Sequence, residues 1–300
     1  MNTKIFFSPA PHKIYVETFG KRSRKIALFI HGGYHSGMCW NQTPDGRHGW
    51  GRLAAKNGYW ALVTDMPGVG RSGGVDFTKI NSRFVIEGYK KLIESLNGEI
   101  TLFVHSLSGF IGFKLAELLP EKINAIIAVE PSLIANVQEE SKPTIETTTT
   151  VEINYRNLPF TLDMTKPILA TEVLIQRFTT QNKHEDTLFP KDQKSLKQYI
   201  ASLQPQHPRL MYEVFNINGS KPPIEDFSKL TKIKILVITS PNDPLHKDDD
   251  VKIVNKLRAE GCKVDFWDKS MTMLEFNSHM LIVEKNNAEI FEKIINWLQI

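Results

Sequence analysis

The chain has 300 residues, of which 41% are hydrophobic and 23% are charged, a composition typical of globular proteins that excludes disordered and fibrous classes. The net charge is only +4, and the basic residues are spread along the chain, which argues against a nucleic-acid partner or a polybasic membrane-binding segment. No apolar stretch is long enough to span a bilayer, and the start of the chain lacks the apolar region of a signal peptide. The two cysteines, Cys39 and Cys262, form no CxxC pair, so we expect a protein of the reducing cytoplasm.

Short apolar runs alternate with longer segments of helical periodicity, which predicts βαβ units around a mostly parallel, doubly wound sheet of the α/β class. In the first half we expect strands at 26–31, 60–64, 101–104 and 125–129, and helices over 82–96 and 108–119. Ser82 is the expected N-cap of the first of these helices. In the last quarter we expect strands at 233–239 and 263–267 and helices near 246–260 and 286–299.

The alternation stops between Ser132 and Asp226, where three helix-like segments occur at 168–178, 196–203 and 210–215. An irregular helical insert inside a resumed βα pattern predicts a mainly helical cap over the sheet. We expect its helix faces to form a largely apolar pocket roof; these faces carry Leu169, Val173, Phe178, Tyr199, Met211 and Phe215. The expected division is therefore a core at 1–134, a cap at 135–225 and the remainder of the core at 226–300. Residues 135–224 hold ten basic and ten acidic side chains, so we expect the cap to present no net field to a charged substrate.

A serine lies at the junction between an apolar strand and a helix, in the segment Val104-His105-Ser106-Leu107-Ser108. Such a junction is typical of a nucleophilic serine, which a sharp turn of sequence Gly-x-Ser-x-Gly lifts above the sheet edge. The N–H of Leu107, at the helix N-terminus, then points at an oxyanion formed there. Ser108 is small enough for its place in the turn, whereas Val104 departs from the usual glycine. The alternative interpretation of Ser106 is a helix N-cap. Whether the chain also offers a base, an acid and a second oxyanion donor decides between a nucleophile and a cap.

The segment His31-Gly32-Gly33 directly follows the first expected strand and is suited to supply a second oxyanion-binding N–H. His31 and His35 have a spacing that would suit a metal on a helix, but the glycines between them make a helix improbable. We therefore expect no metal ligands here.

The other partners of Ser106 lie later in the chain. His279 follows the last expected strand, in a loop that can reach over the sheet edge. Two acids could orient it. Glu130 comes straight out of an apolar strand before Pro131, and a carboxylate near a core needs a partner; Asp243 follows the strand at 233–239, in a turn where aspartate is common for local hydrogen bonding. The residues alone favour Glu130 and leave Asp243 as the alternative acid.

Five segments, at 31–50, 65–72, 105–109, 129–132 and 277–287, together resemble the esterase 713-like bacterial α/β-hydrolases. The resemblance covers most of the core and leaves the cap unmatched. It implies the α/β-hydrolase fold and a Ser–His–Glu triad of Ser106, His279 and Glu130. It also implies that the backbone N–H groups of Gly33 and Leu107 form the oxyanion hole, and that the substrates are esters.

The predicted function is thus a serine esterase that cleaves a small-molecule carboxylic ester through an acyl-enzyme, with no metal and no organic cofactor. An acyltransferase or a lactonase could use the same triad. A non-catalytic ligand-binding protein on the same fold is a third reading, although a pure receptor need not keep all three residues. Expected partners are a small ester and no nucleic acid, and the sequence leaves a homodimer open.

Overall fold

The structure is a computed structural model that describes residues 4–155, 158–179, 187–188, 192–246 and 249–299. Its centre is an eight-stranded sheet of order β1-β2-β4-β3-β5-β6-β10-β11. All neighbouring pairs from β4 to β11 are parallel, whereas β1 and β2 run antiparallel at one edge. The strands are β1 (Lys4–Phe7), β2 (Tyr15–Phe19), β3 (Lys25–Ile30), β4 (Trp60–Asp65), β5 (Glu99–His105), β6 (Ile123–Val129), β10 (Lys234–Ile238) and β11 (Val264–Trp267). The predicted mostly parallel sheet is confirmed.

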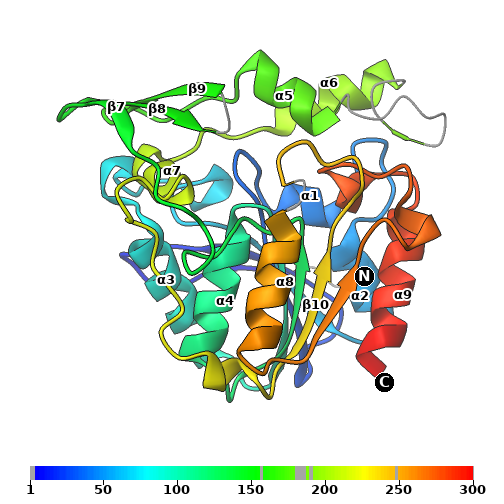
Figure 1. Ribbon diagram of the computed structural model, residues 1–300. Helices are drawn as coiled ribbons and strands as arrows, with labels where there is room; N and C mark the ends of the chain where they lie inside the picture. Colours follow the sequence, from blue (N-terminus) through cyan, green and yellow to red (C-terminus); the bar gives the residue numbers. More distant parts are fainter. Residues whose placement is uncertain (1–3, 156–157, 180–186, 189–191, 247–248, 300) are drawn as a thin grey trace.

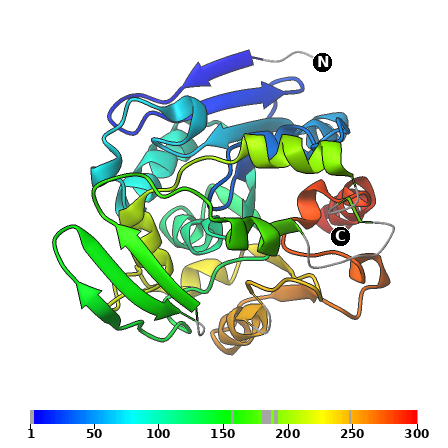
Figure 2. The ribbon, with the colours of Figure 1, turned by 90° about the horizontal axis from the view of Figure 1, so that it is seen from above.

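Helices cover both faces of this sheet. Helix α2 packs against α9, and α3 packs against α4. Figures 1 and 2 show these two pairs on opposite sides of the strands, with α8 beside α4. The helices of the core are α1 (Met38–Asn41), α2 (Trp50–Lys56), α3 (Ser82–Ser95), α4 (Ser108–Leu118), α8 (Asp249–Ala259) and α9 (Asn287–Gln299). Short 3-10 helices occupy Gly70–Ser72, Phe77–Lys79, Phe227–Leu230, Thr272–Leu274 and Leu281–Val283.

Aromatic rings fill the space between the sheet and the α2–α9 layer. Phe29 of β3 stacks on Phe103 of β5 with ring centroids 4.5 Å apart, and Phe103 in turn stacks on Phe291 of α9. Trp50 of α2 packs edge-on against Phe103 and donates its indole N–H to the Asn287 carbonyl at the start of α9. This packing holds the strand ends in a rigid frame, as a site built on them requires.

The segment between β6 and β10 lies over the carboxyl-terminal edge of the parallel strands (Figures 1 and 2). It contains the expected helices as α5 (Glu172–Thr179), α6 (Gln193–Ser202) and α7 (Pro208–Val214). It also contains an antiparallel sheet that the sequence analysis did not predict, made of β7 (Pro143–Glu146), β8 (Thr150–Tyr155) and β9 (Leu158–Asp163). We call residues 135–225 the insert.

Three other details differ from the expectations. Strands β1 and β2 were not predicted, because β2 is buried along its whole length and yet includes Glu17 and Thr18. The cap of α3 is Asn81, whose side chain accepts the Phe84 N–H, and not Ser82. Helix α8 begins at Asp249 among the described residues, and positions 247 and 248 of the helix expected near 246–260 lie outside them.

No helix among the described residues has the length and hydropathy needed to cross a bilayer. Both cysteines, Cys39 and Cys262, are free thiols.

Candidate active site

Ser106 lies on a sharp turn between β5 and α4. Its φ of +51° falls in the left-handed region, which is strained for a residue other than glycine and costs about 1–3 kcal/mol. Hydrogen bonds hold this backbone: the Ser106 N–H donates to the Val129 carbonyl, and the Ser106 carbonyl accepts from Gly109 and Ser132. An observed strain that the surroundings maintain in this way is typical of a functional residue rather than of an ordinary helix cap.

The unusual Val104 in this turn is accommodated by a glycine one turn along the facing helix. A Cβ added to Gly112 of α4 would lie only 2.6 Å from Val104 Cγ1, so the missing side chain provides the room that Val104 needs. Ser108, at the other unusual position, is fully buried. Its hydroxyl accepts the His105 N–H and donates to the Ile30 carbonyl, which ties the turn to β3.

The Gly32-Gly33 loop closely approaches Ser106. A Cβ on Gly32 would lie 2.7 Å from His105 Nδ1 and 3.0 Å from Ser106 Cβ, so a larger residue could not occupy this position without a shift. Within the described part of the chain, the N–H groups of Gly33 and Leu107 donate to no protein acceptor, although both residues line the same cavity as Ser106. Two unpaired backbone donors beside a strained serine are suited to bind a negatively charged oxygen.

Two buried histidines hold the carbonyls of this loop. The Nδ1–H of His31 donates to the Gly32 carbonyl while its Nε2 accepts the Met66 N–H. The Gly32 carbonyl and the Gly33 N–H belong to one peptide plane and point in opposite directions, so this bond also fixes where the Gly33 N–H points. His35 Nδ1–H donates to the Gly33 carbonyl, and its Nε2 accepts from the Tyr199 hydroxyl of α6.

Burial keeps both of these histidines neutral. It lowers the pKa of His31 below its usual value and lowers the pKa of His35 to about 3. The spacing of His31 and His35 along the chain suggests only a metal site, whereas their hydrogen bonds to the loop carbonyls depend on the tertiary structure.

The imidazole of His279 is fully buried in a cluster of aromatic rings. It stacks on Phe178 of α5, with centroids 5.4 Å apart, and on His246, with centroids 5.2 Å apart. His105 Nε2–H donates to the His279 carbonyl and holds the backbone. Nε2 of His279 has no hydrogen-bond partner among the described residues, so it is available to accept a proton.

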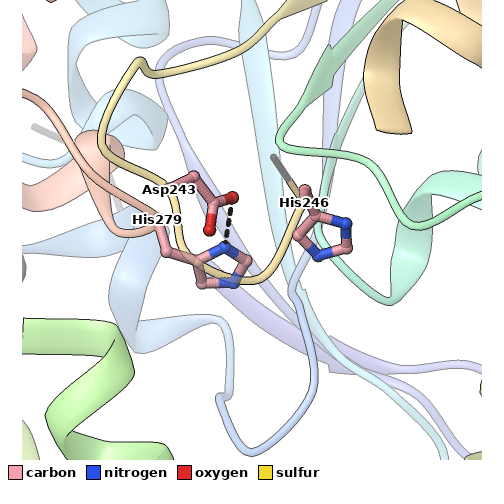
Figure 3. A group of neighbouring side chains, drawn as sticks. All are labelled: Asp243, His246 and His279. Atoms are coloured by element: carbon pink, nitrogen blue, oxygen red, sulfur yellow. Dashed lines mark hydrogen bonds and ion pairs between the residues drawn. The ribbon is translucent and has the colours of Figure 1, made fainter. Parts of the chain in front are cut away.

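The acid that contacts His279 is Asp243. Its Oδ2 accepts a hydrogen bond from His279 Nδ1 at 2.9 Å, and its Oδ1 accepts the Leu245 N–H. Figure 3 shows this contact with His246 beside the two residues. Burial alone would raise the pKa of Asp243, but attraction to His279 and the hydrogen bond from its ring lower the pKa below its usual value. Asp243 is therefore ionised at neutral pH.

Glu130, the acid that the sequence favoured, does not hydrogen-bond to His279. Its Oε1 accepts the Ser240 N–H at 2.6 Å, and its Oε2 has no hydrogen-bond donor among the described residues. Burial raises the pKa of Glu130 well above its usual value, and the nearby carboxylates of Asp243 and Asp250 raise it further. Glu130 is thus a neutral acid beside an ionised one, and the contact expected between it and His279 is made by Asp243 instead.

A cavity of about 110 Å³ opens beside Ser106 under the insert. Its lining is mostly apolar and comes from the Ser106 turn, the Gly32-Gly33 loop, the insert and the loop that carries His246. The contributing insert residues include Tyr155, Phe160, Leu174, Arg177, Phe178, Met211 and Phe215. Of the residues expected in the apolar pocket roof, Phe178, Met211 and Phe215 line this cavity; Arg177, which also lines it, was not among those expected. Leu169 and Val173, also expected to face inward, are exposed.

Asp243, His246 and His279 are the described residues whose ligand atoms lie close enough together, within 4.8 Å, to hold a metal ion. Oδ2 of Asp243 and Nδ1 of His279 are already hydrogen-bonded to each other. A cation at this place would therefore replace the contact that orients His279, so the donor set fits proton transfer better than metal binding.

Comparison with known proteins agrees with this architecture. A model described as the alpha/beta hydrolase family matches residues 27–292. A protein of a fungal species (strain ATCC 74256) named probable secreted lipase phiG is 21% identical over 333 aligned positions, which cover 91% of this chain and 81% of the relative. A solved bacterial esterase has a TM-score of 0.57 at 17% identity, covering 99% of this chain and 93% of its own. A solved N-acyl homoserine lactonase has a TM-score of 0.62 at 15% identity, covering 99% and 97%. At these identities the likeness to the solved structures shows the fold.

Proposed function

Because the chain belongs to the alpha/beta hydrolase family, we propose that it is a serine hydrolase that cleaves carboxylic esters. The observation that carries the proposal is the strained Ser106, which lines an apolar cavity together with two unpaired backbone donors, Gly33 and Leu107. The hydrogen-bonded pair of His279 and Asp243 supports it as the base and its orienting acid. The curated relative is named a lipase and one structural neighbour an esterase, which is consistent with an ester as substrate.

In the proposed reaction, Ser106 Oγ attacks the ester carbonyl carbon while His279 Nε2 takes the hydroxyl proton. Asp243 accepts the Nδ1–H and stabilises the charged imidazolium. The carbonyl oxygen becomes an oxyanion bound by the N–H groups of Gly33 and Leu107, and one such donor is typically worth about 3–4 kcal/mol. His279 then protonates the leaving alkoxide. Water, activated by the same histidine, hydrolyses the acyl-enzyme and restores Ser106.

Covalent labelling tests this proposal most directly. A fluorophosphonate should modify the protein once per chain, at Ser106, and the Ser106→Ala variant should be unlabelled while its circular dichroism is unchanged. The same variant should lose about 10⁴-fold or more of kcat for 4-nitrophenyl butyrate. A Ser106→Ala variant that kept a tenth of the wild-type rate would disprove the nucleophile assignment, and product analysis with added alcohols separates hydrolysis from acyl transfer.

A further inference from the structure

Building on the proposed ester hydrolysis, we propose that Arg177 binds an anionic group of the substrate. The preferred esters would then carry a carboxylate or a phosphate-like group on the part that enters the cavity beside Ser106. This assigns the enzyme a substrate class, acidic esters, that neither its fold nor its relatives specify.

The position of Arg177 follows from the face that α5 turns toward the site. Leu174, Arg177 and Phe178 are spaced three and four residues apart, so they share one side of the helix, and all three line the cavity with Ser106. Phe178 stacks on the ring of His279 at an interplanar angle of 18°. This face of α5 therefore lies against the proposed base, and Arg177 lines the same cavity as Ser106.

The surroundings of Arg177 offer no charge partner among the described residues. This arginine makes no hydrogen bond or ion pair with any residue that the structure describes, although its side chain is half-buried. The lining residues within the described ranges include no aspartate or glutamate. A guanidinium stays charged at every pH at which the protein is folded, and its planar fork matches a carboxylate or phosphate. A negatively charged substrate group would supply the missing partner.

Several other arginines of the chain have polar partners in the protein. Arg71 binds Asp65 and Glu17, Arg47 binds Asp45 and backbone carbonyls of the 283–285 segment, and Arg258 donates to the Val264 carbonyl. Arg209 of α7 has no such partner in the described part of the chain, but it is exposed and lies outside the cavity lining. Arg177 thus combines an unpaired charge with a place in the site. The equal numbers of acidic and basic residues over 135–224 conceal this, because an average over 90 residues says nothing about one cavity.

Matched substrates test the proposal. For the acyl side, mono-(4-nitrophenyl) adipate and 4-nitrophenyl hexanoate differ only by a terminal carboxylate in place of a methyl group. For the alcohol side, 4-(carboxymethyl)phenyl and 4-(phosphonomethyl)phenyl hexanoate are compared with 4-methylphenyl hexanoate, which also separates a carboxylate from a phosphate-like group. In at least one series the wild-type enzyme should have a higher kcat/KM for the anionic ester than for the neutral one. The ratio of the two kcat/KM values should fall as salt is added, because salt screens the attraction to Arg177.

Variants at position 177 then identify the residue responsible. Arg177→Gln should lower kcat/KM for the preferred anionic ester by about 10- to 100-fold and change that of the neutral ester by less than about threefold. Arg177→Lys should retain part of the preference for the anionic ester, since lysine keeps the positive charge but lacks the planar, forked donor arrangement of the guanidinium. Arg209→Gln is the matched control and should leave both rates unchanged.

An equal effect of Arg177→Gln on both members of every pair would overturn the proposal, as would a wild-type enzyme without preference for any anionic ester. Titration of the Ser106→Ala variant with the uncleaved esters gives the same comparison as a Kd, with and without Arg177→Gln. Binding that discriminates in the absence of turnover would support the Arg177 site even if ester hydrolysis failed, so the two proposals fail separately.

Discussion

At the scale of single residues, two adjacent carboxyl groups differ in their protonation and in their contact with His279. Asp243 is ionised and contacts His279, whereas burial and neighbouring negative charge keep Glu130 protonated. Two carboxylates in one buried site cannot both ionise cheaply, so one of them holds a proton. The protein places that proton on the group that does not touch the imidazole.

This difference between the two carboxyl groups predicts unequal effects of two similar substitutions on kcat. Asp243→Asn removes the charge behind His279 and favours the wrong imidazole tautomer, so kcat should fall by about 100-fold or more. Glu130→Gln replaces one neutral group with another of similar shape, so kcat should stay within about tenfold of wild type. Steady-state kinetics on both purified variants, with thermal unfolding to check the fold, provides the measurement. A folded but inactive Glu130→Gln together with an active Asp243→Asn would show that Glu130 is the acid that orients His279, as the family resemblance implies.

At the scale of elements, the Ser106 turn depends on how closely α4 approaches β5. Gly112 allows that approach by leaving space for Val104, so this pair replaces the glycine usually found before the serine. The valine at position 104, where the usual motif has glycine, is thus compensated by Gly112, eight positions later in the chain. The compensation keeps the turn, and with it the position of Ser106.

Gly112→Ala should therefore destabilise the protein by about 1–3 kcal/mol, because overpacking at Val104 outweighs the better helix propensity of alanine. Val104→Ala should relieve much of that penalty in the double variant. Urea unfolding of the wild type, both single variants and the double variant gives the coupling free energy. A Gly112→Ala variant more stable than wild type would show that the close approach at Val104 is not a real constraint.

At the scale of the whole molecule, two glutamates connect the insert to the core: Glu284, which is buried, and Glu213, which is partly buried. Glu213 of α7 accepts the Ser82 N–H at the start of α3, and Glu284 of the core accepts the Leu188 N–H of the insert. Burial raises the pKa of each to about 7. Both therefore keep a proton in the folded protein at pH values where the unfolded chain has released it.

The sign of their contribution to stability follows from this difference in proton binding. Between pH 4.5, the ordinary value, and about 7 the folded state binds more protons, so the stability that these groups contribute falls as pH rises. Buried histidines act in the opposite direction, since the pKa of His35 falls to about 3 and that of His207 to about 4. The wild type and a glutamate variant contain the same histidines, so the difference between their free energies of unfolding reports the contribution of that glutamate alone.

Relative to Glu284→Gln, the wild type should lose stability between pH 5 and pH 7.5, and the same should hold relative to Glu213→Gln. Urea unfolding at both pH values measures this difference. Glu139→Gln, at an exposed position of the insert, is the control and should show no such trend. A pH-independent difference for both Glu213 and Glu284 would mean that they are not protonated in the folded state.

The sequence by itself determined the parallel sheet, most helix positions and the place of Ser106 at a strand–helix junction, because periodicity and junction chemistry are local properties. It also predicted that His279 and an acid lie at the same edge of the sheet as Ser106, since loops after parallel strands share that edge, and the structure brings His279 into contact with Asp243. Only the tertiary structure decided which acid reaches His279. Strands β6 and β10 are neighbours with Val129 opposite Ile238, so Glu130 and Asp243 emerge side by side and no spacing along the chain ranks them. The sheet β7–β9 and the unpaired Arg177 likewise depend on how the insert packs over the core, which pairs residues far apart in the chain.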